Sequence, residues 1–540
     1  MLKKQLKYFV LVLLFTIPAF LSLTLLPFFT FHDEVQIVNL HQYNQAINLA
    51  GFPPRWAPDM HFNYGSPFPE FNYQLPYYLG YLFHQAGLTF TVTFKALLIT
   101  SLIAGAIGMY LLALQFTSPL WAFVASVLYT FTPYHAVAVY VRGTLGESFA
   151  LGLFPWVFWS LYRLKSKKST IDLILAGLMV AALILTHQLA TILMLPFIIL
   201  FTLRPRQLAA TTLGLLISAY YWLPVAIEQK LIQPSSPFNF YDHFPFIKQL
   251  ISSPWAYGAS VTGPGDYVSF QIGHLNLILI PVSLFILLFL RRHIAHRRLF
   301  LLTLLSTLLV IVLMNIRTSF FWQVFPFTQL VQFPWRLLML TTFFTSLLFV
   351  FLSSLIPAKL TLPILVISLL LSLWPNVSYF QPGEVFDRND SYFFNRFLPG
   401  SAEYLKHTED YVPLPITAIR PKQLPPTKLT AIRQFVPTIT DDNPLNYQVT
   451  IDQPQDQNFT YHAFYFPGWQ AMVDGSAVST SAEEHGYISF FVPQGTHQLR
   501  IAYTNTPIRQ LSNYISLITL ILLLQLFVID RLIKMDILKT

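Results

Sequence analysis

Long apolar segments recur along the 540-residue chain and constrain its fold more than any other feature. Runs of about 17 to 25 apolar residues, wound as helices, match the ~30 Å hydrocarbon core of a bilayer. Fifty-four per cent of the residues are hydrophobic and only 11% are charged, whereas a soluble domain carries about 25% charged residues. The sequence therefore predicts a polytopic α-helical membrane protein.

Short basic clusters between the apolar runs predict the orientation. They are "YRLKSKKS" at 162–169, "RPR" at 204–206 and "RRHIAHRR" at 291–298. Lys and Arg favour cytoplasmic loops, so we expect all three clusters and both termini to be cytoplasmic. The opening "MLKKQLK" has the basic character of a signal peptide, but no small-residue cleavage site follows the first apolar run, which predicts an uncleaved first span.

Threading spans between these clusters gives about twelve crossings of the cell membrane. We expect them near residues 8–28, 92–115, 119–138, 148–163, 171–186, 188–203, 208–226, 272–290, 299–315, 336–355, 360–376 and 511–532. The short pair around His187 can instead form a re-entrant hairpin. In this topology the active face is extracytoplasmic and consists of the polar segments 29–91, 139–147, 227–271, 316–335 and 377–510.

The chain divides into three predicted parts. Residues 1–376 form a transmembrane module with an amphipathic outer loop at 29–91, residues 377–510 form an extracytoplasmic β-rich domain, and residues 511–540 form the final span and a cytoplasmic tail.

The β-rich domain is predicted from alternating polar and apolar residues. The strand patterns are "YQVTID", "YISFFV" and "HQLRIAYT". Asp-Gly, His-Gly and Gln-Gly pairs lie between them as turn signals, so we expect a small β-sandwich. Its aromatic residues can stack on sugar rings or form the core of the domain; they are Tyr465, Phe466 and Trp469.

Charge and cysteine content exclude several classes of function. The net charge of +9 could indicate a nucleic-acid partner. However, the mean hydropathy is +0.53, and the Lys and Arg residues form short clusters between apolar runs, as in cytoplasmic loops of membrane proteins. We therefore expect no nucleic-acid partner. The chain has no cysteine, which excludes disulfides, thiolate metal sites and cysteine nucleophiles.

Two adjacent carboxylates directly follow the first apolar run, in "FTFHDEVQIVNLHQYNQ" at 29–45. On a helix, the apolar residues Ile37, Leu40, Tyr43, Ile47 and Ala50 fall on one side, and Glu34, His41, Gln45 and Asn48 fall on the other. Such a helix would lie in the membrane interface and hold Asp33 and Glu34 at the outer surface. The alternative is an ordinary helix start, where acidic residues favour the helix dipole.

Other ionisable residues on the outer face are candidates for the same site. Arg142 opposes the positive-inside bias, and its partner is either Glu147 or a phosphate, which Arg binds bidentately. His187 lies between two apolar runs, where it is either functional or bonded within the helix bundle. Arg336 precedes a span beside Trp335, which is also typical of interfacial anchoring.

Several segments, in order along the chain, resemble one family. They are "FHDEVQIVNLHQYNQAI", "GSPFPEFNYQLPYYLGYL", "YVRGTLGESFA", "QFPWR", "YFPGWQAMVDG" and "VPQGTHQLRIAYT". Together they resemble the 6-pyruvoyl-tetrahydropterin-synthase-related multi-pass membrane proteins, a label that implies no pterin chemistry. These proteins are similar to the C-type membrane glycosyltransferases.

The resemblance implies an inverting transferase on the outer face, which moves a sugar from a polyprenyl-phosphate carrier to a cell-envelope glycan or lipid acceptor. The family's acidic residue after the first span matches Asp33 as the catalytic base, with Glu34 as a supporting group. Arg142 and Arg336 are the candidates for binding the carrier phosphate, and His32, His41, Glu147 and His187 are further substrate-binding candidates. Some relatives use a divalent metal and others use none, so the resemblance leaves metal dependence open.

Two readings from other classes remain. The same polar groups can line a path through which a transporter or flippase moves lipid-linked sugars, although the sequence has no internal repeat of the kind that transporters often show. The chain can also be a non-catalytic scaffold that presents its β domain to envelope polymer. Substitution of Asp33 would leave a scaffold unharmed.

Overall fold

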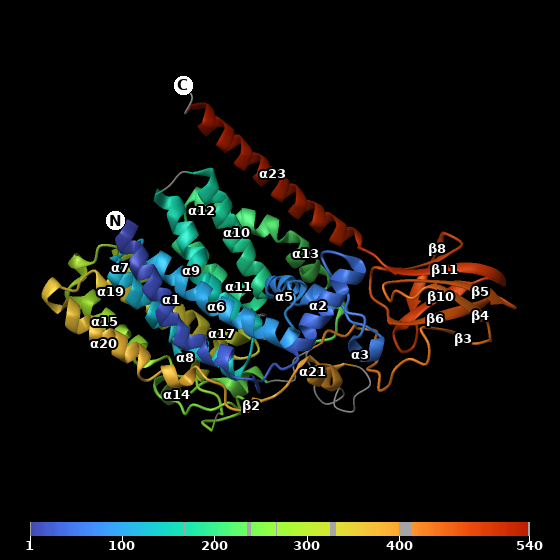
Figure 1. Ribbon diagram of the computed structural model, residues 1–540, viewed down its shortest axis with the longest axis horizontal. Coiled ribbons are helices and arrows are strands. Elements are labelled where there is room, and N and C mark those ends of the chain that lie inside the picture. Colours follow the sequence, from blue (N-terminus) through green and yellow to red (C-terminus); the bar gives the residue numbers. More distant parts are fainter. Residues whose placement is uncertain are drawn as a thin grey trace.

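The computed structural model describes residues 2–166, 169–234, 239–265, 267–324, 331–398 and 412–537. The chain is mostly helical, with a β-rich region near the C-terminal end (Figure 1). The start of α1 (Leu2–Leu25) and the end of α23 (Pro507–Ile537) lie away from the β-rich region, which projects from the opposite end of the helical part (Figure 1).

Five helices of the described chain are long and apolar enough to cross a membrane. They cover Gln5–Leu25, Phe90–Ala113, Pro334–Ser353, Ala358–Tyr379 and Pro507–Leu532. Three bent pairs raise the number to eight if each pair is one span. The apolar helices α10 (Thr170–Thr186), α11 (Gln188–Phe201) and α15 (His274–Phe289) are shorter. The structure therefore supports a polytopic helical protein, and the count of twelve spans stays a prediction.

One of the bent pairs ends directly before Arg142, in an outer loop. Helix α7 (Pro119–Thr130) and the following turns, α8 (Pro133–Ala136) and η1 (Val137–Val141), meet at 49°. Pro133 favours an extended conformation in the preceding residue, and Thr132 has ψ 134°, so the helix breaks there. The π-helical turn η1 then ends at Arg142, and Gly143 follows with φ 62°. The sequence prediction of one continuous span at 119–138 did not include this break.

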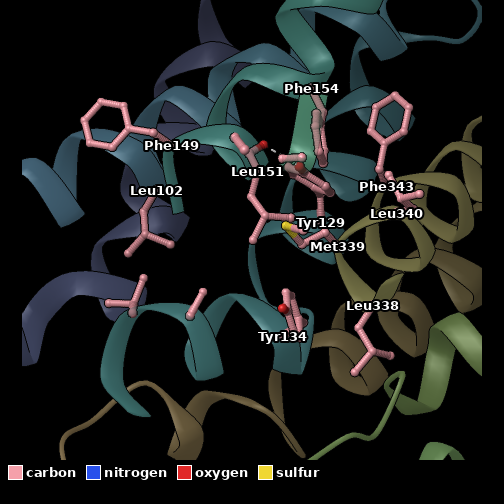
Figure 2. Packing of buried hydrophobic residues seen from close by; sticks show 14 of the residues in the cluster. Leu102, Tyr129, Tyr134, Phe149, Leu151, Phe154, Leu338, Met339, Leu340 and Phe343 are labelled. Atoms are coloured by element: carbon pink, nitrogen blue, oxygen red, sulfur yellow. Dashed lines mark hydrogen bonds between the residues drawn. The ribbon is translucent and has the colours of Figure 1, made fainter. Parts of the chain in front are cut away.

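Close helix packing forms the core next to that loop. Residues from α6 (Phe90–Ala113), α7, α9 (Leu145–Ser166) and α19 (Leu338–Ser353) project into one cluster (Figure 2). Small residues allow this approach, because a Cβ at Gly152 would lie 2.8 Å from the carbonyl oxygen of Ser101. The Tyr129 hydroxyl donates to the carbonyl of Leu151, which satisfies a polar group inside this apolar cluster.

Helix α2 (Gln36–Ala50) lies where the sequence predicted an amphipathic helix, but its burial is broader than that pattern. Ile37, Leu40 and Tyr43 are buried as expected, but Gln36, Asn39 and Gln42 are buried too. Helices α5 (Leu75–Gln85) and α21 (Asp390–Phe397) pack against α2, so protein covers part of this helix. Its position at the membrane interface stays a prediction.

The β-rich region consists of two antiparallel sheets. The first has the order β3 (Leu429–Ala431), β6 (Gln457–Phe464), β10 (Tyr487–Val492), β9 (Thr480–Ala482). The second has the order β4 (Val436–Asp441), β5 (Asn446–Gln453), β11 (Gly495–Tyr503), β7 (Trp469–Val473), β8 (Ser476–Val478). The three predicted strand patterns are confirmed as β5, β10 and β11. Phe466 and Trp469 lie in the shared core rather than on an open sugar-binding surface.

The boundary expected at residue 377 differs from the structure. Strand β2 (Val385–Phe386) pairs with β1 (Phe28–Phe29) at the exit of α1, and α21 packs against α2. Conversely, the outer loop at 29–91 contributes to the β-rich region, because its residues Trp56, Phe62 and Tyr64 are buried in the core of that region. The two parts therefore exchange segments, because each buries apolar side chains from the other.

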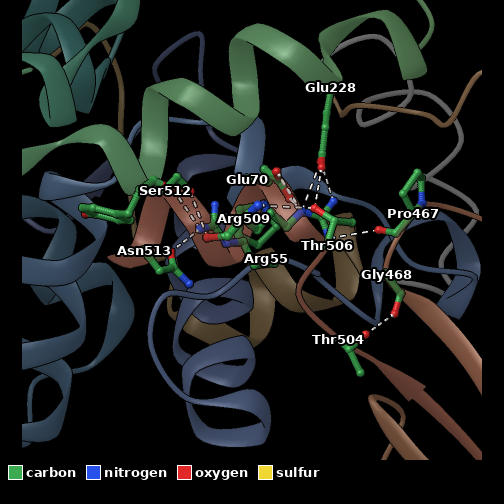
Figure 3. A network of polar contacts seen from close by, with 12 residues as sticks. Arg55, Glu70, Glu228, Pro467, Gly468, Thr504, Thr506, Arg509, Ser512 and Asn513 are labelled. Carbon is green, nitrogen blue, oxygen red and sulfur yellow. Dashed lines mark hydrogen bonds and ion pairs between the residues drawn. The ribbon is translucent and has the colours of Figure 1, made fainter. Parts of the chain in front are cut away.

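A buried charge network joins the β-rich region, the last helix and the helical part (Figure 3). The Arg509 side chain is fully buried and forms ion pairs with Glu70 of α4 (Phe68–Phe71) at 3.0 Å and with Glu228 of α13 (Ala219–Glu228) at 2.6 Å. Its Nη1 also donates to the carbonyl of Pro467 at 2.9 Å. Arg55 donates to Asn513 of α23 at 3.0 Å. These contacts connect four segments that are remote in sequence at the start of α23.

Candidate functional site

A cavity of about 1590 Å³ lies where the outer loops meet the helix ends. Its walls come from the segment after α1, the start of α11, the segment after α13, the segment before α19, and the segment from Arg388 to the end of α21 (Asp390–Phe397). Among the described lining residues, five are cationic and two are carboxylates. The cationic residues are Arg142, Lys230, Arg336, Arg388 and Arg396, and the carboxylates are Asp33 and Glu34.

The first charged cluster has Glu147 at its centre. This carboxylate is fully buried, and it forms ion pairs with Arg142 through Oε2 and with Arg336 through Oε1, the latter at 3.0 Å. The Tyr134 hydroxyl also donates to Oε2 at 2.7 Å. Two guanidinium groups on one carboxylate leave one net positive charge at the cavity wall, while Glu147 itself lies behind the wall.

Both arginines of this cluster are oriented by further contacts. The Arg142 guanidinium lies 4.9 Å from the ring centroid of Trp335, and Arg336 donates through Nη1 to the carbonyl of Val331 at 3.2 Å. The sequence left open whether Arg142 pairs with Glu147 or with a phosphate. The structure contains the pairing with Glu147, and the same guanidinium still lines the cavity.

Backbone pairing brings Asp33 beside this cluster. The backbone N–H of His32 donates to the carbonyl of Val141, and that of Asp33 donates to the carbonyl of Arg142, both at 3.0 Å. Asp33 is thus fixed next to a residue that is more than 100 positions away in the sequence.

The Asp33 carboxylate is accessible from the cavity and makes no ion pair or side-chain hydrogen bond with the described part of the chain. Burial raises the pKa of Asp33, and the opposing attraction of Arg142 and His32 is smaller. A carboxylate with a raised pKa and no bonded partner is suited to accepting a proton.

Glu34 has a different environment from its neighbour. It forms ion pairs with Arg388 at 2.8 Å and with Arg396 at 3.3 Å. Both of these contacts are ion pairs, whereas Asp33 has none within the described residues. The structure therefore separates two adjacent acids that the sequence could not tell apart.

The histidine candidates have three different environments. His32 faces the cavity, and its Nε2 donates to the carbonyl of Tyr257 at 3.1 Å, which leaves Nδ1 as an acceptor. His187 also lines the cavity; its Nδ1 accepts from the N–H of Ala190 at 3.1 Å, so in the neutral ring Nε2 is the donor.

His41 lies elsewhere. Its ring contacts Phe90 at 5.5 Å and Phe394 at 4.7 Å between centroids. It does not belong to the described lining of the cavity, because the side of α2 that carries it faces α21 and the start of α6. The substrate-binding role suggested for His41 therefore has no support from the described lining of this cavity.

Sequence reasoning missed Arg388, Arg396 and Lys230 as lining residues. The two arginines were assigned to the β-rich domain, although they belong to the helical part. The signal that singled out Arg142, an arginine expected on the outer face against the positive-inside bias, applies equally to both of them.

The donor set among the described residues of the cavity does not fit a divalent metal. In the described chain, no group of three or more His, Asp or Glu side chains is arranged to hold an ion. Asp33 and His32 are consecutive residues of two ligand types, and both interact electrostatically with Arg142. A divalent cation requires several oxygen or nitrogen donors rather than a guanidinium neighbour, so we derive no step through a metal.

Comparison with known proteins confirms the resemblance over part of the chain. Residues 71–258 match the family model described as 6-pyruvoyl-tetrahydropterin synthase related domain, membrane protein. This segment contains Arg142, Glu147 and His187, whereas Asp33, Arg336 and the arginines of α21 lie outside it. No curated protein matches the chain.

Similarity to solved structures occurs at low identity. One example is the single-particle cryo-EM structure of arabinofuranosyltransferase AftD from Mycobacteria, with 17% identity and a TM-score of 0.46. The match covers 73% of this chain and 28% of AftD, so the chain spans just over a quarter of that protein's length.

Proposed function

We propose that this protein is a membrane glycosyltransferase that moves a sugar from a polyprenyl-phosphate carrier to an acceptor hydroxyl. The observation that carries the proposal is the Asp33 carboxylate, which has no ion pair within the described residues and lies beside the Arg142–Glu147–Arg336 cluster, in one cavity at the ends of apolar helices. The arrangement supplies a base and a cationic phosphate site within reach of a membrane-anchored carrier.

The chemistry assigns one role to each group. The acceptor oxygen attacks the anomeric carbon, and its proton passes to the Asp33 carboxylate. The bond between the anomeric carbon and the phosphate oxygen breaks on the opposite side, and the polyprenyl phosphate leaves with the bonding electron pair. Arg142 and Arg336 stabilise the negative charge that develops on the leaving phosphate. The anomeric configuration is therefore inverted.

The proposal places the cavity on the outer face of the cell membrane, with about twelve spans and both termini in the cytoplasm. Reporter tags inserted after residues 166 and 295 should then be accessible only from the cytoplasm. A tag near residue 455, in the β-rich region, should be accessible from outside. A cytoplasmic signal at 455 would contradict this orientation.

Arginine substitutions test the phosphate site. Replacing Arg142 or Arg336 by Gln should weaken binding of polyprenyl phosphate by about tenfold or more, because a hydrogen bond to a charged group contributes roughly 1.5–3 kcal/mol. Binding can be measured with the purified chain in lipid nanodiscs.

Tyr134→Phe is the matched control, since it removes one hydrogen bond to Glu147 and leaves both cations in place. Donor binding should be close to wild type in this variant. Equal donor affinity in wild type and in both arginine variants would remove Arg142 and Arg336 from the phosphate site.

A further inference from the structure

We propose that Gln36 and His187 bind hydroxyl oxygens of the transferred sugar, in a subsite that accepts an uncharged hexose or pentose. The inference rests on the proposed function, because it assigns the sugar of the polyprenyl-phosphate donor to the same cavity. It adds the chemical class of that sugar and two side chains that recognise it.

One wall of the cavity is polar but uncharged. The wall consists of α2, the segment from α4 to the start of α5, and the start of α11. No Lys, Arg, Asp or Glu of these three segments belongs to the described lining, whose polar members here are Gln36, Asn39, Asn72, Tyr73, His187 and Gln188. Such groups suit the hydroxyls of a neutral sugar, whereas an anionic sugar against this wall would lack a cation.

The Gln36 side chain presents its amide nitrogen as a free donor. Its Oε1 accepts from the hydroxyls of Tyr77 at 2.5 Å and Tyr73 at 3.2 Å. The Tyr77 hydroxyl itself accepts from Nδ2 of Asn39 at 3.4 Å and of Asn72 at 3.3 Å, so its proton is available for the Gln36 oxygen. Gln36 Nε2 has no acceptor among the described residues, and Gln36 lines the cavity, so its N–H groups can bind a ligand there.

His187 presents a second free donor. Its Nδ1 accepts from the backbone N–H of Ala190 at 3.1 Å, so in the neutral ring the proton is on Nε2. This Nε2 has no acceptor in the described part of the chain, and His187 lines the cavity. Tyr73 connects the two donors, because its hydroxyl is bonded to Gln36 and its ring centroid lies 5.8 Å from that of His187.

Close packing places the uncharged wall beside the proposed phosphate site. A Cβ at Gly146 would lie 2.5 Å from Cδ2 of His187 and 2.8 Å from Cε1 of Tyr73, so both rings contact the residue that precedes Glu147. His187 also interacts electrostatically with Glu147 and Arg336. A sugar joined to a phosphate at the arginines therefore lies within reach of this wall.

The proposed base adjoins the same wall. The backbone N–H of Gln36 donates to the carbonyl of Asp33 at 2.9 Å, and Tyr73 and Tyr77 both interact electrostatically with Asp33. The reaction requires the anomeric carbon to lie between the base and the leaving phosphate. The sugar ring that carries this carbon must then contact groups that adjoin both, which the uncharged wall does. The Asp33 carboxylate disfavours a second negative charge on that ring.

Binding of donors that differ only in their sugar tests the subsite. The full-length chain in lipid nanodiscs is titrated with polyprenyl phosphates that carry glucose, galactose, mannose, arabinose, xylose or glucuronate. Polyprenyl methyl phosphate is the reference, since it is a phosphodiester without a sugar. We expect at least one neutral sugar to raise the affinity above this reference, and we expect glucuronate to give a smaller gain.

Two variants remove one free donor each. Gln36→Met replaces the amide by an apolar side chain of similar size, and His187→Asn removes Nε2 but keeps an acceptor for the N–H of Ala190 at the helix start. Each should lower the affinity for the neutral-sugar donor about fivefold and leave that for polyprenyl methyl phosphate unchanged. Gln45→Met is the matched control, because Gln45 belongs to α2 but not to the described cavity lining, and it should change neither affinity.

The inference is overturned if no neutral sugar raises the affinity, or if glucuronate gives the largest gain. It is also overturned if the Gln36 and His187 variants keep the full gain. Equal losses for the sugar donor and for polyprenyl methyl phosphate would likewise overturn it, since the two residues would then act on the phosphate or on the fold.

Failure of the proposed function has a separate signature. If the wild-type chain transfers no sugar but still binds the neutral-sugar donor more tightly through Gln36 and His187, the subsite stands without transferase activity. Transfer without any sugar-dependent gain in affinity would support the proposed function and overturn the subsite.

Discussion

Replacement of Asp33 by Asn is expected to lower the turnover of sugar transfer by about 10²-fold or more while donor binding survives. Asn keeps the shape and a hydrogen-bonding oxygen but cannot accept the proton of the acceptor hydroxyl. The comparison requires purified protein in lipid, a radiolabelled polyprenyl-phosphate sugar and an envelope acceptor, with transfer and donor binding followed separately.

Stability provides the first control for this variant. Since burial raises the pKa of Asp33, the surroundings disfavour its charged form. The neutral Asn should therefore be tolerated, and the unfolding temperature at neutral pH should equal or exceed that of wild type. A loss of activity together with a lower unfolding temperature would point to misfolding instead.

The pH profile provides the second control. The base acts only when deprotonated, and its raised pKa moves the acidic limb of kcat/KM to higher pH than for an ordinary carboxyl group. Arg142 lowers this pKa, so Arg142→Gln should move the limb higher still. Glu34→Gln should leave the limb in place, because Glu34 is paired with Arg388 and Arg396. If transfer were lost only in the Glu34 variant, Glu34 rather than Asp33 would be the base.

Replacement of Arg509 by Met is expected to destabilise the protein by about 3–5 kcal/mol, because it leaves Glu70 and Glu228 buried without their shared cation. Thermal unfolding in nanodiscs, followed by tryptophan fluorescence, measures the effect. Detachment of the β-rich region should accompany it, since Arg509 also binds the carbonyl of Pro467.

Two measurements test whether buried carboxylate charge causes the destabilisation by Arg509→Met: its pH dependence and its size in a double variant. Burial raises the pKa of Glu70 to about 7, and Arg509 opposes that rise. Without the arginine, Glu70 should remain neutral to higher pH, so the destabilisation should be smaller at pH 5 than at pH 8. Glu70→Gln combined with Arg509→Met should recover part of the loss. Equal destabilisation at both pH values, with no recovery, would exclude the buried charge as its cause.

The sequence predicted the helices well because hydropathy is a local property. The predicted span at 92–115 corresponds to α6 (Phe90–Ala113), and that at 511–532 lies within α23. The bend at Pro133 was missed, since an apolar run continues through it. The boundary of the β-rich region was also missed, because the pairing of β2 with β1 joins segments more than 350 residues apart.

The candidate site was only partly predictable for the same reason. Position after the first span was enough to select Asp33 and Glu34, but their roles depend on partners that the sequence does not place. Arg388 reaches Glu34 across 354 positions, so the pairing that distinguishes the two acids exists only in the folded chain. The place of His41 outside the described cavity lining was not predictable, because helical periodicity predicts the side of α2 on which it lies, not the elements that cover that side.

The most direct measurement follows one labelled sugar in proteoliposomes that contain the wild-type chain. The donors are polyprenyl phosphates carrying a radiolabelled hexose or pentose, and the label is followed both to a water-soluble envelope glycan acceptor and across the bilayer. A glycosyltransferase should move the label from the lipid to the acceptor, and Asp33→Asn should abolish that movement. Movement of intact donor across the bilayer, with no label on the acceptor and no effect of Asp33→Asn, would contradict the assignment of transferase activity to this cavity.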